Sequence, residues 1–186
     1  MRVAGIDPSL NSTGLALPDG TTHTLKQKAA DGDYRLVKIR TAFIAAIFPP
    51  NRPDLVVIED LPKNAMGAGI TGQVQGVLRE VMQAYKIPYL KVSPATVKKA
   101  ATNDGRADKP AMRKAWLEYT GIDNPRDDEV DAAWMRTVGQ YLVGDIEAPA
   151  PHWDAAVKNL RPAFEQLNLG AQNWIKGYVI ADEEVA

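Results

Sequence analysis

The feature that most constrains the fold is a short apolar run, Leu55 to Glu59, which lies between Pro53 and Pro62. A continuous apolar segment of this length is typical of a strand that is buried on both faces of a parallel sheet. Residues 1–7 form a second short apolar segment, and both segments end in an acidic residue. Two buried strands with acids at their carboxyl ends are therefore expected.

Hydrophobic spacing and the positions of Pro and Gly predict the other elements. Strands are expected at residues 13–17, 21–26 and 88–92, and helices at residues 34–48, 73–85 and 124–142, with two short helices flanking residues 102–108. Asn124 is expected to cap the last long helix, and the Gly-rich residues 67–72 are expected to form a flexible loop. Strands followed by alternating helices and strands predict an α/β fold with a mixed central sheet and flanking helices.

The length of 186 residues predicts one domain over residues 1–144, with a C-terminal extension over residues 145–186 whose role the sequence leaves open. Residues 154–167 of this extension could form a helix interrupted by Pro162. The sequence shows neither a long apolar run nor a signal-peptide pattern, so the protein is expected in the cytoplasm, without a membrane partner. The absence of Cys fits a reducing compartment and excludes thiol catalysis and zinc ribbons.

Four acidic residues are expected to converge on one site. Asp7 and Glu59 end the two buried strands, and sites in open α/β sheets form at the ends of strands. Asp128 and Asp131 lie three residues apart near the start of the last long helix, where they share one face. Clustered carboxylates repel one another unless a cation joins them, and an all-oxygen site favours Mg²⁺ or Mn²⁺. Two such ions could activate a water for attack on a phosphodiester.

Each acid also has a simpler interpretation. Asp7 could be a turn residue, and Glu59 could be a solvated residue at the end of a strand. Asp128 and Asp131 could simply stabilise the helix dipole. Because neighbouring strand residues point to opposite faces of a sheet, only one of Glu59 and Asp60 can line the site.

Basic residues concentrate between Lys86 and Trp116, although the formal net charge of the chain is only −1. This segment carries eight basic residues and two acidic ones, which leaves a local surplus of six. Such a surplus could hold a phosphate backbone. The alternative is an exposed helical face with solvated lysines.

Three stretches resemble the motifs of the RuvC Holliday junction resolvases, in the same order and with similar separation. They are GIDPSLNSTGLAL from Gly5, VVIEDLP from Val56 and DDEVDAAWM from Asp127, within a match that covers residues 2–143. The resemblance implies a ribonuclease H-like fold, a homodimer, two Mg²⁺ ions per site, and paired nicks across a four-way DNA junction. Mn²⁺ is expected to substitute for Mg²⁺.

The resemblance also implies roles for individual residues. The implied metal ligands are Asp7, Glu59, Asp128 and Asp131. Lys98 and Lys109 lie in the segment that in this family supplies basic residues to the cut phosphate, where they would act as point charges. The residues expected to contact DNA are Lys98, Lys99, Arg106, Lys109 and Arg113.

The chain departs from the family pattern at two positions. Ser9 stands where the family often has Gly, and we expect this change to be tolerated. Pro62 stands near the second acid, where the cellular enzymes place an aromatic residue that stacks at the junction centre. The second departure leaves the distortion of the junction and the sequence preference open.

Two other functions stay open from the sequence. GIDPSLNSTG also resembles the first phosphate loop of actin-like ATPases and sugar kinases, although no second glycine-rich phosphate loop is visible. A non-catalytic protein that binds DNA junctions, with acids that merely cap helices, is the other alternative. ATP turnover without DNA cleavage would favour the first, and metal-independent binding would favour the second.

Overall fold

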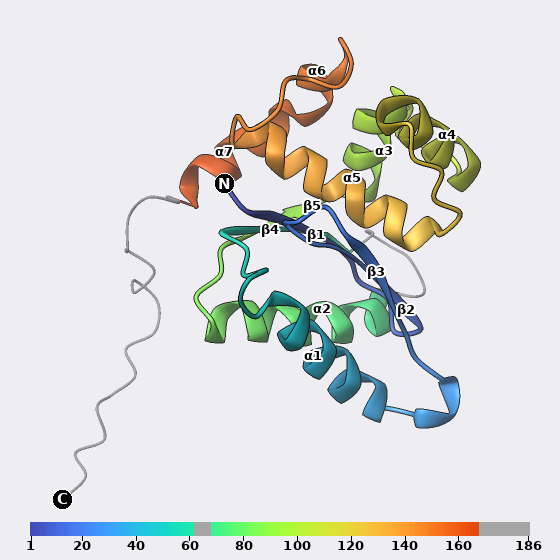
Figure 1. Ribbon diagram of the computed structural model, residues 1–186, viewed down its shortest axis with the longest axis vertical. Coiled ribbons are helices and arrows are strands. Elements are labelled where there is room, and N and C mark those ends of the chain that lie inside the picture. The colour runs from blue at the N-terminus through green and yellow to red at the C-terminus, as the bar shows by residue number, and fades with distance from the viewer. Residues whose placement is uncertain (62–67, 168–186) are drawn as a thin grey trace, which may run out of the picture.

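The structure is a computed structural model that describes residues 1–61 and 68–167 (Figure 1). The strands are β1 (Val3–Asp7), β2 (Ser12–Ala16), β3 (Thr22–Lys26), β4 (Leu55–Glu59) and β5 (Tyr89–Val92). The helices are α1 (Tyr34–Ile47), α2 (Ala68–Ala84), α3 (Pro94–Thr102), α4 (Lys109–Thr120), α5 (Asp127–Leu142), α6 (Trp153–Val157) and α7 (Arg161–Gln166), with the 3₁₀ helices η1 (Ala29–Asp31) and η2 (Lys158–Leu160). The five strands predicted from the sequence are confirmed.

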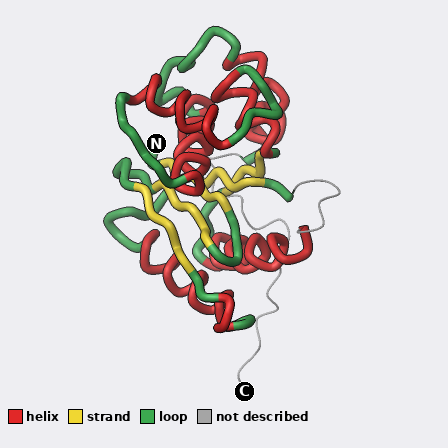
Figure 2. The backbone as a smooth tube through the Cα atoms, turned by 90° about the vertical axis from the view of Figure 1, so that its right-hand side faces the viewer, coloured by secondary structure: helices red, strands yellow, loops and turns green. Residues whose placement is uncertain are grey.

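One mixed sheet forms the centre of the structure, in the strand order β3-β2-β1-β4-β5. The pairs β1–β2 and β2–β3 are antiparallel, whereas the pairs β1–β4 and β4–β5 are parallel. Figure 2 shows helices on both sides of this sheet. Because β1, β4 and β5 run in the same direction, their carboxyl ends lie at one edge of the sheet, which confirms the predicted mixed sheet with flanking helices.

The side chains of the central strands alternate between two hydrophobic cores. Ile6 of β1 and Ile58 of β4 belong to the core that packs against α1 and α2. The opposite face of the same strands packs against α5 and against residues of α3, α4 and α6. Because strand side chains alternate, the residues that follow, Asp7 and Glu59, face α5.

Helix α5 lies directly on the sheet because glycines remove the side chains beneath it. A Cβ atom at Gly5 would collide with the backbone carbonyl oxygen of Ala132, and one at Gly14 would collide with that of Asp128. Close approach of another backbone is one use of Gly inside strands. These two glycines bring the N-terminal half of α5 against the carboxyl end of β1 and the start of β2.

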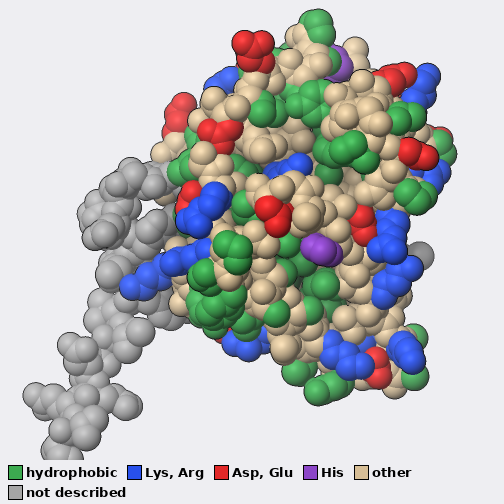
Figure 3. Space-filling model, viewed as in Figure 1, with side chains coloured by type: hydrophobic (Ala, Val, Ile, Leu, Met, Phe, Trp, Pro, Cys, Tyr) green, Lys and Arg blue, Asp and Glu red, His purple; other side chains and the backbone are tan. Residues whose placement is uncertain are grey.

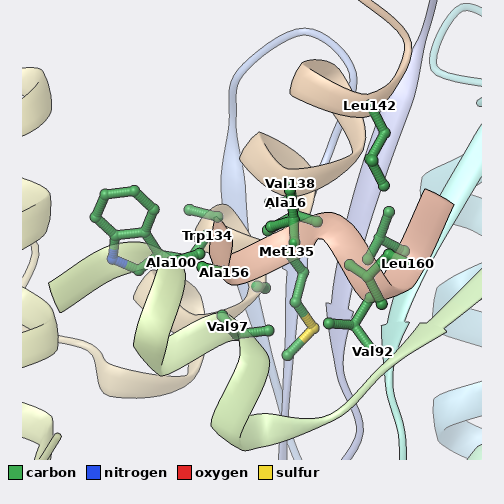
Figure 4. Packing of buried hydrophobic residues seen from close by; sticks show 14 of the residues in the cluster. Ala16, Val92, Val97, Ala100, Trp134, Met135, Val138, Leu142, Ala156 and Leu160 are labelled. Atoms are coloured by element: carbon green, nitrogen blue, oxygen red, sulfur yellow. The ribbon is translucent and has the colours of Figure 1, made fainter. Parts of the chain in front are cut away.

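Helices α3, α4 and α6 pack around α5 on the outer side of the molecule. Figure 4 shows Met135 of α5 among hydrophobic side chains that include Val97 of α3 and Leu160 of η2. Three tryptophans are buried in this core: Trp116, Trp134 and Trp153. The fourth, Trp174, lies outside the described residues.

Two predicted details of secondary structure are wrong. Residues 68–72 of the Gly-rich stretch form the start of α2 rather than a flexible loop, because packing of the helix on the sheet outweighs the low helix propensity of Gly. Arg126 occupies the N-cap position of α5 without a capping hydrogen bond from its side chain, and the side chain of Asn124 instead accepts a hydrogen bond from the Arg126 N–H at 2.9 Å. The predicted interruption near Pro162 is confirmed, because residues 153–166 divide into α6, η2 and α7, and Pro162 lies in the first turn of α7, where its missing N–H costs no hydrogen bond.

The chain beyond residue 144 continues into the second core. Trp153 and Val157 of α6 are buried there. Pro62 and residues 168–186 lie outside the described residues. Of the helices in the described ranges, none combines the length and the apolar character that crossing a bilayer requires.

Candidate functional site

Asp7 and Glu59 end two neighbouring parallel strands. The register of β1 and β4 pairs Ile6 with Ile58, so the next residues along the two strands come side by side. The carboxyl groups of Asp7 and Glu59 share a hydrogen bond. The structure thus brings together two acids that are 52 positions apart in the sequence (59 − 7).

Asp131 reaches the same place from the second turn of α5. The negative charge of its carboxylate raises the pKa of both Asp7 and Glu59. Burial raises the pKa of Asp131 itself, against the lowering effect of a hydrogen bond from Lys109. We call Asp7, Glu59 and Asp131 the carboxylate cluster.

Every member of the carboxylate cluster has a raised pKa. For Asp7 the pKa lies well above its ordinary value, first because of burial and then because of the hydrogen bond and the charge of Glu59. For Glu59 burial is again the largest cause of the raised pKa, and the hydrogen bond with Asp7 opposes it. The cluster therefore holds protons more tightly than free carboxylates do, unless further positive charge enters.

Two lysines supply positive charge to the cluster. Lys109 is the first residue of α4, which Asp108 caps, and its ammonium group contacts the carboxylate of Asp131. Burial lowers the pKa of Lys109, but the contact with Asp131 and the nearby acids outweigh burial, so the pKa is raised. Lys98 of α3 also acts on the cluster, because its charge lowers the pKa of two of the three acids.

Asp128 lies at the edge of the cluster. Its carboxylate accepts a hydrogen bond from the Ser12 hydroxyl at 2.8 Å, which turns it toward β2. The α5 acid whose charge raises the pKa of Asp131 is Asp127, four positions earlier on the same helix face. Coordination of a metal by Asp128 therefore stays a prediction.

Asp60 points away from the cluster. Its carboxylate forms an ion pair with Lys91 of β5, with 3.2 Å between Nζ and Oδ1. Because side chains alternate along a strand and Glu59 faces α5, the side chain of Asp60 points to the opposite face of the sheet. Glu59, and not its neighbour, lines the site.

The residues predicted to contact DNA lie on α3, on α4 and in the loop between them. Lys109 contacts the carboxylate cluster and the charge of Lys98 lowers the pKa of two of its acids, whereas Lys99 and Arg106 are exposed to solvent. Arg113 is held by the protein, because its Nε lies 3.4 Å from Asp127 Oδ1 and its Nη1 donates to the carbonyl of residue 125 at 3.2 Å. For all five residues, contact with DNA stays a prediction.

Glu129 is a buried acid whose role the sequence analysis missed. Its carboxylate accepts hydrogen bonds from Thr22 at 2.7 Å, Thr24 at 3.0 Å, Asn124 at 3.1 Å and Arg126 at 2.9 Å. Burial alone would raise the pKa of Glu129, but these hydrogen bonds outweigh it and lower the pKa. This network ties β3 to α5. Thr22 and Thr24 alternate along β3, which indicates a polar stripe on one face of the strand. The spacing of residues does not show that Glu129, on a helix far along the chain, is their partner.

The chemistry of the carboxylate cluster fits a divalent cation. Within residues 1–61 and 68–167, no three Asp, Glu or His side chains are arranged to hold one ion as they stand. Lys109 contacts Asp131, and Asp7 shares its hydrogen bond with Glu59. Three partly buried carboxyl groups with raised pKa values nevertheless favour the entry of positive charge, and carboxylate oxygens are the ligands that Mg²⁺ and Mn²⁺ prefer.

Comparison with known proteins identifies relatives of the chain. No protein-family model matches it. Among curated proteins, the crossover junction endodeoxyribonuclease RuvC of Gloeobacter violaceus is 33% identical over 156 residues, which cover 76% of this chain and 88% of the relative. The RuvC of Caldicellulosiruptor saccharolyticus is 28% identical, over 70% of this chain and 86% of the relative.

Solved structures of RuvC have the same fold. The structure of T. thermophilus RuvC in complex with a Holliday junction substrate matches with a TM-score of 0.63 at 20% identity, over 75% of this chain and 93% of that one. A structure of Thermus thermophilus RuvC matches with a TM-score of 0.58 at 22% identity, over 74% of this chain and 93% of that one. The fold is therefore ribonuclease H-like, as expected. With a relative that is 33% identical over most of both chains, the chain belongs to the RuvC family of crossover junction endodeoxyribonucleases.

Proposed function

We propose that this chain is a metal-dependent endonuclease that cuts four-way DNA junctions by paired nicks on opposite strands, in recombination or repair. The observation that carries the proposal is the carboxylate cluster, where Asp7, Glu59 and Asp131 meet beside the ammonium group of Lys109. The relatives that match this chain are named crossover junction endodeoxyribonucleases. A partly buried acidic cluster that could hold divalent cations, next to lysines, supports hydrolysis of a phosphodiester.

The proposed cofactor is Mg²⁺, with two ions per site and with Mn²⁺ as a substitute. Asp7, Glu59 and Asp131 would provide oxygen ligands, and Asp128 would provide another from the edge of the cluster. When bound, such ions supply an activated water and offset the charge on the leaving oxygen of a phosphodiester. The raised pKa values support this proposal, because burial and, to a smaller extent, the charges of neighbouring acids disfavour the ionised carboxyl groups, and a bound cation would offset both effects.

The lysines beside the cluster have a proposed role toward the scissile phosphate. Lys109 and Lys98 are compact point charges that can stabilise negative charge as it develops on phosphate oxygens. The contact between Lys109 and Asp131 keeps that ammonium group next to the acids before DNA arrives. Lys99, Arg106 and Arg113 would extend the positive surface and contact neighbouring phosphates.

The proposed assembly is a homodimer in the cytoplasm. Paired nicks on opposite strands require two active sites, and closed two-fold dimers are the commonest form of soluble oligomer. Light scattering of the protein with and without a junction would measure the molar mass and thus the oligomeric state. A species that stays monomeric on DNA and nicks only one strand would contradict it.

Cleavage of a synthetic four-way junction in Mg²⁺ tests the proposed function. The wild-type protein is expected to nick two opposite strands symmetrically. Asp7→Asn is expected to abolish cutting and to leave binding intact, because it removes one carboxylate of the cluster and no basic residue. In Ca²⁺ the wild-type protein is expected to bind without cutting. Asp60→Asn is the matched control, since this neighbouring acid points away from the cluster, and it should cut like wild type.

Other outcomes would change the assignment. ATP hydrolysis without DNA cleavage would favour the ATPase interpretation. Junction binding that needs no metal, with no cutting under any condition, would favour a non-catalytic binding protein. Equal cutting of flaps and single strands would preserve the nuclease and remove its junction specificity.

A further inference from the structure

A second group of basic residues lies across the sheet from α3 and α4. Lys26 ends β3, and Lys28 follows two residues later in an extended conformation. Both residues are exposed, and neither forms an ion pair within residues 1–61 and 68–167. Figure 3 shows Lys and Arg side chains along the right-hand edge of the view, where Figure 1 draws the end of β3 and η1. We call Lys26 and Lys28 the β3 basic pair.

The sheet directs Lys26 toward the face that carries the carboxylate cluster. Thr24 points to this face, because its hydroxyl donates to Glu129 of α5 at 3.0 Å. Because side chains alternate along a strand, Lys26, two residues after Thr24, points to the same face. Its partner across the β2–β3 ladder is Ser12, whose hydroxyl donates to Asp128. Lys26 therefore lies beside the residue that holds a predicted metal ligand.

The loop that follows β1 fixes the segment that carries Lys28. The carbonyl of Asn11 accepts a hydrogen bond from the N–H of Gln27 at 2.9 Å. The side-chain oxygen of Asn11 accepts another from Arg35 at 2.7 Å. Asn11 belongs to the loop that begins after Asp7, so the β3 basic pair is anchored to the loop of the site.

Acids near the β3 basic pair neutralise it only in part, because the charge of Lys28 acts on Asp31, a carboxylate that is already paired with Lys38. Asp31 forms an ion pair with Lys38 at 2.7 Å, and the carboxylate of Asp128 accepts its hydrogen bond from Ser12. The segment from residue 26 to residue 38 contains four basic residues and two acidic ones, which leaves a net charge of +2. The surface keeps positive charge available for an anion.

We propose that the β3 basic pair holds the phosphate backbone of the DNA arm that leaves the carboxylate cluster on the β3 side. This inference rests on the proposed nuclease function. Positive charge then flanks the acids on both sides, with Lys98 and Lys109 toward β5 and the β3 basic pair toward the opposite edge of the sheet. Phosphate contacts of this kind set the register and orientation of a protein on DNA.

The spacing of the strands indicates how far from the cut bond the β3 basic pair would contact the DNA backbone. One strand separates β3 from β1, so the two lie about 10 Å apart across the sheet. The ladder aligns Asp7 with Thr24 through Gly14, and Lys26 lies two residues farther along. Since each DNA strand carries one phosphate per roughly 3.4 Å of helix axis, the contact is expected about three nucleotides from the cut bond.

The test compares wild type with Lys26→Ala/Lys28→Ala on a four-way junction in Ca²⁺, after the cut bond has been mapped in Mg²⁺. The double variant is expected to bind about tenfold more weakly, and its slope of log K against log salt should shrink by about 2, because two phosphate contacts are lost. Neutral methylphosphonates placed two to four nucleotides from the cut bond should weaken binding of wild type and leave binding of the double variant unchanged.

Controls separate this inference from the proposed function. Lys158→Ala removes one charge from η2, next to α7 and the N-terminus at the other end of the sheet (Figure 1), and should bind like wild type. Lys26→Arg/Lys28→Arg should retain affinity, and Lys26→Gln/Lys28→Gln replaces the alanine variant if circular dichroism shows that it does not fold. If wild type cuts junctions and the variant without both charges keeps its affinity, salt slope and interference pattern, the inference is wrong and the nuclease stands. If wild type neither binds nor cuts the junction, the proposed function itself fails.

Discussion

Glu129 and Asp131 lie two residues apart on α5 and are almost equally buried, with 8% and 13% of their side chains exposed. Their pKa values nevertheless move in opposite directions, down for Glu129 and up for Asp131. Around Glu129, four side chains from β3 and the start of α5 donate hydrogen bonds. Around Asp131, other acids converge and Lys109 is the donor.

This difference separates an acid that holds the fold from an acid that is available for chemistry. A buried carboxylate with enough donors is stabilised in its charged form and needs nothing further. The negative charge of the carboxylate cluster exceeds the positive charge of the nearby lysines. Acids with pKa values shifted in this way are typical of functional sites. The hydrogen bonds of Glu129 therefore stabilise the packing of α5 on the sheet. This packing places Asp131 of α5 beside Asp7 and Glu59.

The largest expected effect follows from removing the charge of Asp131. Asp131→Asn should lower the rate of junction cutting by roughly a thousandfold, because loss of a metal ligand costs several kcal/mol of transition-state stabilisation. Its free energy of unfolding in chelator should not fall, since a repelled carboxylate is removed. Single-turnover cutting and urea unfolding measure the two effects. Similar losses of cutting in Asp131→Asn and Glu129→Gln would remove the distinction between the two acids.

Glu129→Gln should lower the free energy of unfolding by about 2 kcal/mol at pH 7, the scale of hydrogen bonds to a charged group. Cutting per folded molecule should stay close to wild type. The folded pKa of Glu129 lies below its unfolded value, so this stabilisation is present above about pH 4.3 and is lost as pH falls through the folded pKa. Urea unfolding of both proteins at several pH values checks this, and an unchanged difference down to pH 3 would contradict it.

The carboxylate cluster should show the opposite dependence on pH when metal is removed by a chelator. Its acids have folded pKa values above their unfolded values. As pH rises above about 4, the unfolded chain releases these protons before the folded chain does, so the free energy of unfolding falls. Asp7→Asn should flatten this decline. Equal slopes for wild type and Asp7→Asn in thermal unfolding between pH 4 and pH 7 would show that Asp7 is not part of a coupled cluster.

The smallest expected effect concerns the edge of the cluster. Ser12→Ala removes the hydrogen bond to Asp128, which is worth about 1 kcal/mol, so cutting should fall by about fivefold. Asp128→Asn is the comparison, because it removes the carboxylate itself. If Asp128 provides a metal ligand, its variant should lose far more activity than Ser12→Ala, whereas equal small losses would limit Asp128 to a supporting role.

The parts of the structure that follow from local pattern could be predicted from the sequence. Two apolar strands ending in Asp7 and Glu59, together with the parallel arrangement expected of them, were enough to place these acids side by side. Asp131 followed from its helix position and from the family resemblance. Strand alternation and the positions of strand ends follow from neighbouring residues, whereas the metal-binding role of these acids stays a prediction.

The parts that depend on tertiary contact could not be predicted. Two of the four hydrogen bonds that satisfy Glu129 come from Thr22 and Thr24 of β3, more than a hundred residues earlier in the chain. The backbone of α5 lies on Gly5 and Gly14, and no local pattern shows that these glycines meet a helix. The same close approach places Asp128 within hydrogen-bonding distance of Ser12. The fourth predicted acid was therefore the one that the sequence placed least well.

Anomalous X-ray diffraction from crystals soaked in Mn²⁺ tests the central claim, that the carboxylate cluster is a divalent-cation site. The account predicts an anomalous peak in contact with oxygens of Asp7, Glu59 and Asp131, and no such peak in Asp7→Asn crystals. Manganese bound only elsewhere, or none bound at concentrations that support DNA cutting, would contradict it.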